Sequence, residues 1–479
     1  MKIKIITSIV LLFSSINFGQ ILGAYSLNDP VSAAMGNTSA ANSTDTYALH
    51  RNPANLALME NGTFGLSTIL PFPNISENVG TDFLTIDEYN YYFGGIETNN
   101  GTVPRELTAQ DKEDLMNLFK GGGTVFFTHN AEYLRIAYKV SDEVGAFGFS
   151  IADVTTDITT FPQGLIELSL EGNVVGKAFN FNDLDMKASY LRDYSFSYSR
   201  DFSDLVPLPL SKLALGVTFS YVQGLAMGRI DEVKTNIKTN PDNTIDISGH
   251  FVGYAALSPD FNVKYDFDST NTNDDGFQFT PFPTPAGTGF GMDFGLTAGF
   301  EDYLTVGFAV NNIGSITWNK NVAKYESNTA LVIRDITDQD ELDSLKDQIA
   351  LDGKYIDQLK TDLPTVMRLG AALQVDKLIN DFPGYLTIAA DFIKGFNNEA
   401  SNSDKAGFGF GLEYRPVHWL PIMTGIAVGN GRPTTAWSLG IGIDSGVFAF
   451  TIAAHNFGSV IHGNQAKTVN FVLGSRFRF

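Results

Sequence analysis

Histidine, serine and carboxylate side chains are the groups with which this chain could do metal or hydrolytic chemistry. Its six histidines are scattered and form no His-x-x-x-His pair, the spacing that places two metal ligands on one helix face. The Gly-x-Ser-x-Gly pattern of an activated serine does not occur, and neither do the glycine-rich loops that bind nucleotide phosphates. We therefore expect no enzyme activity, no catalytic residue and no cofactor.

One stretch imitates a metal site. Residues 271–276 read Asn-Thr-Asn-Asp-Asp-Gly, like the start of a calcium-binding loop. The closing position of such a loop requires a bidentate glutamate, and Phe282 stands there instead. The chain has no cysteine, so disulfides, thiolate metal ligands and thiol nucleophiles are excluded. The sequence predicts no metal site.

The two ends of the chain indicate where the protein works. Lys2 and Lys4 precede an apolar run, residues 5–13, which is typical of a secretory signal and too short to cross a bilayer as a helix. We expect residues 1–20 to be a cleaved signal peptide. The net charge is −21, which argues against a nucleic-acid partner and is assigned to solvated acidic loops.

Strict alternation of apolar and small residues follows the signal, and the chain ends within such a strand. Residues 405–415, 437–444 and 448–454 place aromatic or branched side chains on one face and mostly Gly, Ala, Ser and Thr on the other. A soluble sandwich also alternates, but its outer face is more polar. The pattern therefore predicts an all-β, transmembrane antiparallel β-barrel in the cell outer membrane. Its expected anchors in outer-membrane lipid are Trp437, Phe448, Phe450, Phe477 and Phe479.

The connections between these strands differ sharply in length. Two- and three-residue turns such as 301–302 and 444–446 belong on the periplasmic side, and long loops belong outside. Helical insertions are predicted in two long loops. Residues 108–120 begin at a Thr108 cap and end at three glycines, and residues 338–363 carry leucine and isoleucine at helical spacing.

The segment before the barrel is small and mildly apolar. Asn52 is suited to cap a short helix with Pro53 at its first position and Ala54 next. The first strand is then predicted over residues 62–70. This organisation gives an N-terminal segment, 21–61, and a barrel, 62–479.

Asn52-Pro53-Ala54, followed by a strand that opens Gly62-Thr63-Phe64-Gly65, resembles FadL-type transporters and the PorV-like barrels of Bacteroidota. Residues 311–318 and 363–371 resemble a Bacteroidota barrel family whose function is not assigned. The FadL resemblance implies about fourteen strands. It also implies that residues 21–61 form a hatch inside the lumen, gated around Asn52, Pro53 and Ala54.

The resemblance implies two functions. A FadL-like barrel passes hydrophobic small molecules across the outer membrane and releases them through a lateral opening. A PorV-like barrel transports nothing and binds a protein partner, in type IX secretion or surface attachment. The partners expected besides lipid are accordingly hydrophobic small molecules or a secretion-system protein, and the sequence leaves both functions open.

Overall fold

A computed structural model describes residues 29–99, 101–207, 209–265, 267, 277–278, 280–334, 353–399, 402–429 and 435–479. The predicted signal peptide and the calcium-like stretch at 271–276 lie outside these residues.

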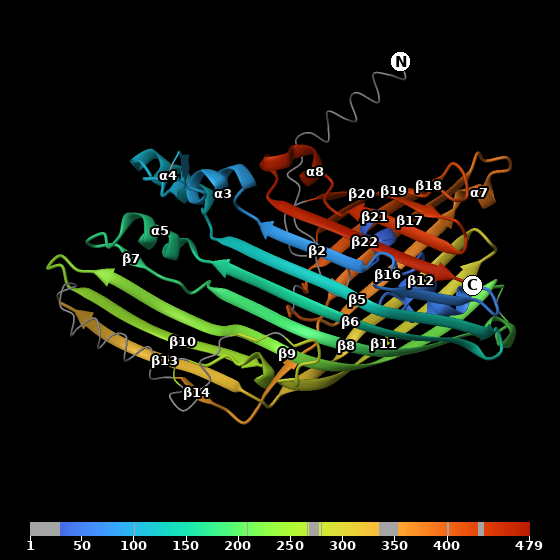
Figure 1. Cartoon of the computed structure of the whole chain (residues 1–479), viewed down its shortest axis with the longest axis horizontal. Coiled ribbons are helices and arrows are strands. Elements are labelled where there is room, and N and C mark those ends of the chain that lie inside the picture. Colours follow the sequence, from blue (N-terminus) through green and yellow to red (C-terminus); the bar gives the residue numbers. More distant parts are fainter. Residues whose placement is uncertain are drawn as a thin grey trace, which may run out of the picture.

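A closed antiparallel barrel of fourteen strands forms the body of the protein, as the sequence predicts (Figure 1). One of its fourteen positions is filled by two consecutive short strands, β1 and β2. The strands are β1 (Phe64–Thr68), β2 (Asn74–Thr81), β5 (Gly123–Ser141), β6 (Gly145–Phe161), β8 (Asp185–Asp201), β9 (Lys212–Thr239), β11 (Gly287–Phe300), β12 (Leu304–Trp318), β16 (Val366–Gln374), β17 (Tyr385–Gly395), β18 (Ala406–Arg415), β19 (Ile422–Gly429), β20 (Ala436–Asp444), β21 (Phe448–Ala454) and β22 (Thr468–Arg478).

The C-terminal strand closes the barrel. β22 pairs with β21 on one side and with both β1 and β2 on the other, so that Gly65 lies opposite Arg478 and Ile75 opposite Leu473. β1 and β2 in turn pair with β5. No strand edge is left open around the barrel, which is the condition for a sheet to cross a bilayer.

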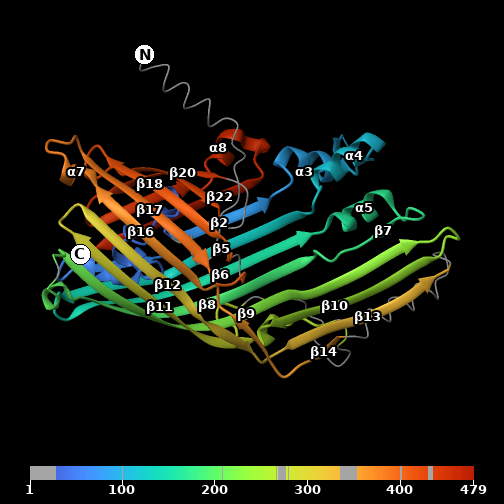
Figure 2. The ribbon, with the colours of Figure 1, turned by 180° about the vertical axis from the view of Figure 1, so that it is seen from behind.

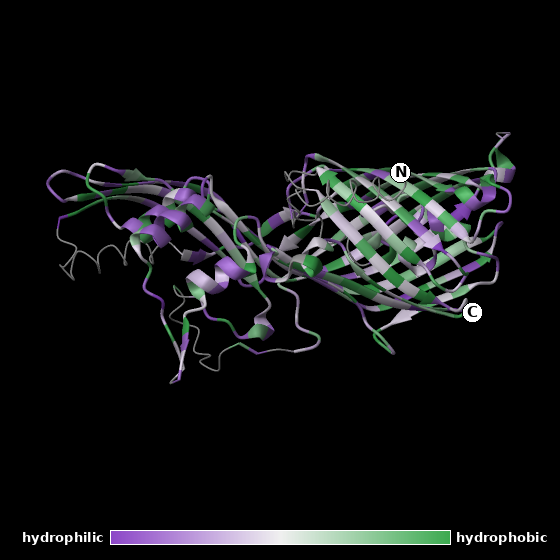
Figure 3. Cartoon of the chain, turned by 90° about the horizontal axis from the view of Figure 1, so that it is seen from above, coloured by the Kyte–Doolittle hydropathy of each residue, from purple (hydrophilic) through white to green (hydrophobic). Residues whose placement is uncertain are grey.

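The outer face of the barrel is apolar. Large side chains that would be buried in a soluble core are exposed here, among them Phe219, Phe294, Phe408, Phe410 and Ile441, and Figure 3 shows green bands alternating with paler ones along the strands. Such a surface is solvated by lipid and not by water. Among the described residues, no helix is long and apolar enough to cross a membrane.

Four neighbouring barrel strands continue beyond the rim as an open, curved sheet. β5, β6, β8 and β9 are the longest strands, β9 having 28 residues, and they run out of the barrel together (Figures 1 and 2). Two further long strands, β10 (Ile245–Leu257) and β13 (Val322–Ile333), extend this sheet. Short strands complete it and the barrel rim: β7 (Ala178–Phe179), β14 (Gly353–Tyr355) and β15 (Leu359–Asp362). The sheet belongs to the long-loop end of the barrel, which is the extracellular end.

The longer helices lie beside this open sheet (Figure 1). They are α3 (Ile86–Phe93), α4 (Ala109–Leu118) and α5 (Gln163–Glu171), and a hairpin of β3 (Ile96–Thr98) and β4 (Gly101–Val103) joins α3 to α4. Single helical turns occur at α7 (Val375–Leu378), α8 (Gly458–His462), η4 (Ser203–Leu205), η5 (Pro259–Phe261) and η6 (Gly463–Gln465).

The two helix predictions had different outcomes. α4 confirms the first, and Thr108 caps it by accepting a hydrogen bond from the Asp111 amide. The second is wrong at residues 353–363, which contain the strands β14 and β15. There, pairing with β13 and β12 outweighs the helical spacing of the leucines. The rest of that prediction, residues 338–352, lies outside the described residues.

Candidate functional site

The described part of the N-terminal segment, residues 29–61, lies against the inner wall of the barrel. It contains α2 (Pro30–Ala34) and the 3-10 helices η2 (Asp45–Ala48) and η3 (Pro53–Leu58), and nearly all of its residues up to Leu58 are buried. Asp29 caps α2 and Asn52 caps η3, each with a proline at the first helical position. The predicted Asn52 cap is therefore present, on a 3-10 helix.

Glycines of the wall allow this close approach. A Cβ atom on Gly216 of β9 or Gly295 of β11 would overlap Ala54, and one on Gly307 of β12 would overlap Ala40. On the opposite wall, a Cβ atom on Gly411 of β18 or on Gly425 of β19 would overlap Met35. The inward glycines thus accommodate the segment on two sides.

Asn52 joins the segment to the wall. Its side-chain amide donates to the Ala40 carbonyl at 2.7 Å and to Thr297 Oγ1 of β11 at 2.9 Å. Thr297 Oγ1 in turn donates to Asn55 Oδ1 at 2.5 Å. Next to this group, Ser199 Oγ of β8 donates to the Ala54 carbonyl at 2.9 Å. Asn52, Pro53 and Ala54 therefore lie at a bonded contact between segment and wall.

A buried carboxylate makes a second attachment. Asp391 Oδ2 of β17 accepts hydrogen bonds from the backbone amides of Ser39 and Ala40, at 2.8 and 2.9 Å. On β16, Arg368 Nη1 points to the Asn37 carbonyl at 3.4 Å. Two backbone amides thus share one carboxylate oxygen of the wall, which attaches the loop after α2 to β17.

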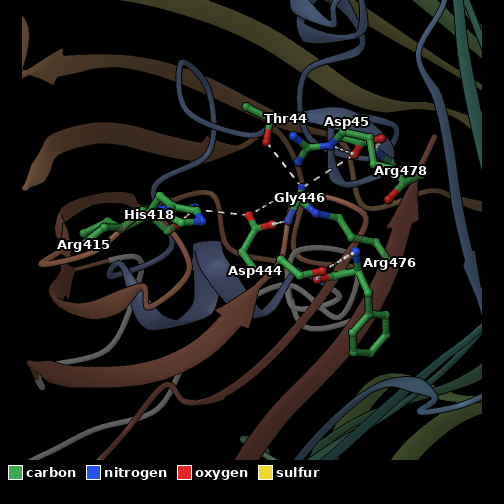
Figure 4. Close-up of polar contacts among 12 residues, drawn as sticks. Thr44, Asp45, Arg415, His418, Asp444, Gly446, Arg476 and Arg478 are labelled. Carbon is green, nitrogen blue, oxygen red and sulfur yellow. Dashed lines mark hydrogen bonds and ion pairs between the residues drawn. The ribbon is translucent and has the colours of Figure 1, made fainter.

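A chain of charges makes a third attachment, at the periplasmic end (Figure 4). Asp45 Oδ2 lies 3.3 Å from Arg478 Nε and 4.0 Å from Arg476 Nη1. Arg476 Nη2 is 3.8 Å from Asp444 Oδ2, and the same oxygen is 3.2 Å from Arg415 Nη1. The segment is therefore tied by ion pairs to the strand that closes the barrel.

The barrel wall is interrupted where β1 gives way to β2. Between the pairs Leu66–Phe477 and Ile75–Leu473, the chain of β1 and β2 has five more residues than β22 opposite it. These five are residues 69–73. They stand out on the membrane side: Leu70 is 71% exposed, and the Phe72 ring lies 4.5 Å from that of Phe450 on the outer face. Pro71 and Pro73 have no amide to donate to a neighbouring strand, which explains the break.

Side chains bridge the interruption in place of the backbone ladder. Asn74 donates to the Ser475 carbonyl at 3.3 Å and accepts from the Ser475 amide at 3.1 Å. Behind it, a Cβ atom on Gly474 would meet the Tyr47 hydroxyl and the Pro30 ring. The N-terminal segment therefore backs the weakened part of the wall.

A pocket lies at the extracellular end of the lumen. Its volume is about 30 Å³, and Leu191, Met227, Ile316, Trp318 and Leu363 form its apolar lining. Lys187, Arg229, Asp362 and Glu399 form a charged rim. A pocket of this size holds one or two water molecules, so a larger solute enters only when the rim moves.

The loop after β17 crosses this rim. Asn397 Nδ2 donates to the Leu363 carbonyl at 2.7 Å, which fixes the base of the loop. Further along, the Asn398 carbonyl accepts from Lys187 Nζ at 2.9 Å, and Glu399 Oε1 lies 3.4 Å from Arg229 Nη1. Two cations of β8 and β9 thus hold a loop that starts four strands away.

The five expected membrane anchors occupy three places. Phe448, Phe477 and Phe479 form an aromatic cluster at the periplasmic end. The ring centroid of Phe477 lies 5.1 Å from that of Phe448 and 6.2 Å from that of Phe479. Phe450 contacts Phe72 beside the interruption. Trp437 packs edge-on against Phe457 at 5.4 Å near the other rim, and its indole N–H donates to Thr424.

Sequence reasoning missed the interruption, since it predicts one strand over residues 62–70. The signal was present as Leu70-Pro71-Phe72-Pro73, because two prolines so close together do not fit a paired strand. It also gave Asp391 and Arg368 no role. Among the described residues, no three histidine, aspartate or glutamate side chains are grouped to hold a metal ion.

Comparisons with known proteins give one match of family and several of shape. No curated protein matches the chain. Three similar solved structures are a TodX deltaS2S3 mutant monoaromatic hydrocarbon channel (12% identity, 94% and 97% of the two chains, TM-score 0.47), the Ralstonia pickettii toluene transporter TbuX (16%, 94% and 98%, 0.45) and a Pseudomonas aeruginosa FadL homologue (11%, 96% and 96%, 0.44). The model of the family of unknown function DUF5723 matches residues 57–455. The chain belongs to that family.

Proposed function

We propose that this outer-membrane barrel passes hydrophobic small molecules from the outside into the membrane through its wall. The observation that carries the proposal is the interruption at residues 69–73. It combines a break in the strand ladder, exposed apolar side chains on the lipid side and the N-terminal segment directly behind it. An apolar solute that reached this point from the lumen would meet lipid and not water.

The entry side of the path is the apolar pocket at the extracellular end. Its lining favours a hydrophobic solute because burying apolar surface contributes about 25 cal/mol per Å². Its volume of about 30 Å³ requires the loop after β17 to move first. The proposed route therefore has two closures, one at each end of the lumen.

The inner closure is the N-terminal segment, which we assign as a hatch spanning residues 21–61. Asn52, Pro53 and Ala54 form its anchoring point, supported by the contacts of Asn52 with Ala40 and Thr297. Because the barrel provides these contacts through side chains, the segment is able to shift without breaking the strand ladder.

Deleting residues 69–73 tests the proposal. The deletion joins Thr68 to Asn74 and restores an unbroken register of the first strand with β22, from Leu66 opposite Phe477 to Ile75 opposite Leu473. We expect the sealed barrel to fold and to lose uptake of a fluorescent hydrophobic solute in proteoliposomes. Replacing residues 69–73 by five glycine and serine residues is the control, since it keeps the break and should keep uptake. Full uptake by the deletion variant would reject the lateral route.

A second candidate function is a scaffold that transports nothing and binds a protein partner. One observation favours it: α3 and the β3–β4 hairpin expose Tyr89, Tyr91, Phe93, Ile96 and Val103 at the extracellular end. Exposed aromatic groups of this kind are typical of protein interfaces. Wild-type protein that carries no solute across a vesicle membrane, and that purifies with a stoichiometric protein lost on replacing Tyr89 and Phe93 by serine, would favour the scaffold.

A further inference from the structure

Polar side chains gather on the inner wall of the barrel at β2, β5 and the connection after β21. Ser76 and Asn78 of β2, Thr128 of β5, and Asn470 of β22 face the lumen together with His455 and Asn456, and each of the six is at most 5% exposed. The register makes them neighbours, because Asn78 lies opposite both Asn470 and Thr128. We refer to these six residues as the polar patch.

The polar patch contains buried hydrogen-bonding atoms without a partner among the described residues. They are Ser76 Oγ, both side-chain atoms of Asn78, Thr128 Oγ1, both ring nitrogens of His455, Asn456 Oδ1 and Asn470 Nδ2. Buried polar groups are almost always hydrogen-bonded, since an unpaired one costs about 1–3 kcal/mol. Eight such atoms on one stretch of wall indicate that a further molecule supplies the partners.

The orientation of Asn470 is fixed by its neighbours. Its Oδ1 accepts from the backbone amides of His455 and Asn456, at 2.8 and 2.9 Å. Turning the amide over would place an NH₂ group against two N–H groups. Asn470 Nδ2 is therefore a donor without a partner, while Asn456 Oδ1 is an acceptor without one.

The polar patch adjoins the apolar pocket. Thr128 lies opposite Thr156 of β6, which lines the pocket and whose hydroxyl is 2.9 Å from that of Ser189 on β8. On the next strands, Val154 of β6 lies opposite Leu191 of β8, and Leu191 lies opposite Gly224 of β9. The Trp318 ring covers Gly224. The inner wall thus changes from polar to apolar within two strands.

We propose that the polar patch binds the head group of an amphiphile whose chain occupies the apolar pocket, and that this head group is uncharged and carries both hydrogen-bond donors and acceptors, as an amide or a hydroxylated group does. The inference rests on the proposed function and specifies its substrate class. All six side chains are neutral amides, hydroxyls or an imidazole, so nothing in the polar patch compensates a full charge. Both donors and acceptors lack partners, so a carboxylate, which only accepts, would leave the acceptors unpaired.

The experiment compares three probes with the same chain: dodecanamide, dodecanoate and dodecane. The full mature protein is placed in phospholipid nanodiscs, and binding is followed by the fluorescence of Trp318, which lines the pocket, in a background with Trp419→Phe and Trp437→Phe. We expect dodecanamide to bind at least tenfold more tightly than either of the other probes, because several hydrogen bonds of about 1 kcal/mol each distinguish it.

A matched pair of isosteric variants assigns the preference to the polar patch. Thr128→Val removes a hydroxyl without a partner, and Thr218→Val removes a buried, inward hydroxyl that is already paired with Ser197 Oγ at 2.7 Å. Thr128→Val combined with Asn78→Leu should reduce the preference for dodecanamide to about threefold or less. Thr218→Val should leave it unchanged. The gel mobility of unheated samples in sodium dodecyl sulfate shows whether each variant is folded.

The outcomes separate this inference from the proposed function. Equal binding of the three probes, or a preference that survives Thr128→Val with Asn78→Leu, would overturn the head-group site while leaving hydrophobic transport standing; the polar patch would then hold water only. Binding of none of the probes by the wild-type protein would overturn the proposed function itself.

Discussion

Arg229 on β9 and Glu399 in the loop after β17 form an ion pair across the mouth of the lumen, with Nη1 and Oε1 3.4 Å apart. The pair closes a loop over the apolar pocket. Because the chain contains no cysteine, Arg229→Cys with Glu399→Cys introduces the only two thiols. A disulfide-containing bifunctional cross-linker that spans the length of the two replaced side chains should fix the loop and abolish uptake of a hydrophobic solute in proteoliposomes, and dithiothreitol should restore it.

Each single cysteine variant is the control for this locking experiment. The side chains of the pair are 17% and 22% exposed, so solvent weakens their attraction and removing one partner costs about 1 kcal/mol or less. The loop should therefore open more easily, and uptake should be equal to or faster than that of the wild type. Uptake that is equally fast in the cross-linked and reduced double variant would show that solutes do not pass under this loop.

Asp391→Ala should loosen the N-terminal segment. The variant loses two hydrogen bonds from the Ser39 and Ala40 amides to a buried acceptor, and a single hydrogen bond contributes about 0.5–1.5 kcal/mol. We expect single-channel conductance in planar bilayers to rise, because the segment no longer seals the lumen. Asp391→Asn retains one acceptor oxygen and should fall between the alanine variant and the wild type. Asp302→Ala, at an exposed position of the short periplasmic turn 301–302, should leave conductance at the wild-type level.

The ion pairs at the periplasmic end should contribute less. Asp45 is buried but Arg478 is 40% exposed, so solvent weakens their attraction. A double-mutant cycle of Asp45→Asn and Arg478→Gln, measured by urea unfolding in lipid vesicles, should give a coupling energy of about 1 kcal/mol that shrinks in high salt. The same cycle for the exposed pair Lys234 and Glu232 should give a value near zero. A coupling of several kcal/mol at Asp45 would contradict this ranking.

The barrel was predictable from the sequence because its physics is local to each strand. Side chains alternate with a period of two, so a strand such as residues 405–415 shows from its residue types alone which face meets lipid. The cap at Asn52 was predictable for the same reason, since capping depends on adjacent residues. The strand predicted at 62–70 is present as β1, Phe64–Thr68, but the prediction also included Ile69 and Leu70, which belong to the interruption.

Contacts between distant segments were not predictable. Asp391 meets Ser39 across more than 350 positions of sequence, and no local pattern marks an inward carboxylate as an anchor. The polar patch illustrates the same limit, because Asn78, Thr128 and Asn470 become neighbours only through strand register. In residues 353–363 the helical spacing of the apolar residues predicted a helix wrongly. There, pairing with other strands at the rim outweighs the local pattern.

Two glycines of β9 provide a final test, because only one of them faces the N-terminal segment. A Cβ atom on Gly216 would overlap the backbone of Pro53 and Ala54, whereas one on Gly228 would meet only Met186 Cε at 3.6 Å. Gly216→Ala should therefore cost about 1–3 kcal/mol through overpacking and admit a large polar antibiotic into cells that express it. Gly228→Ala should fold normally and remain impermeable, since alanine is as good as or better than glycine in a strand with room for it. If both variants leave the cells equally resistant and the barrels equally heat-stable, the close packing of η3 on this wall does not seal the lumen.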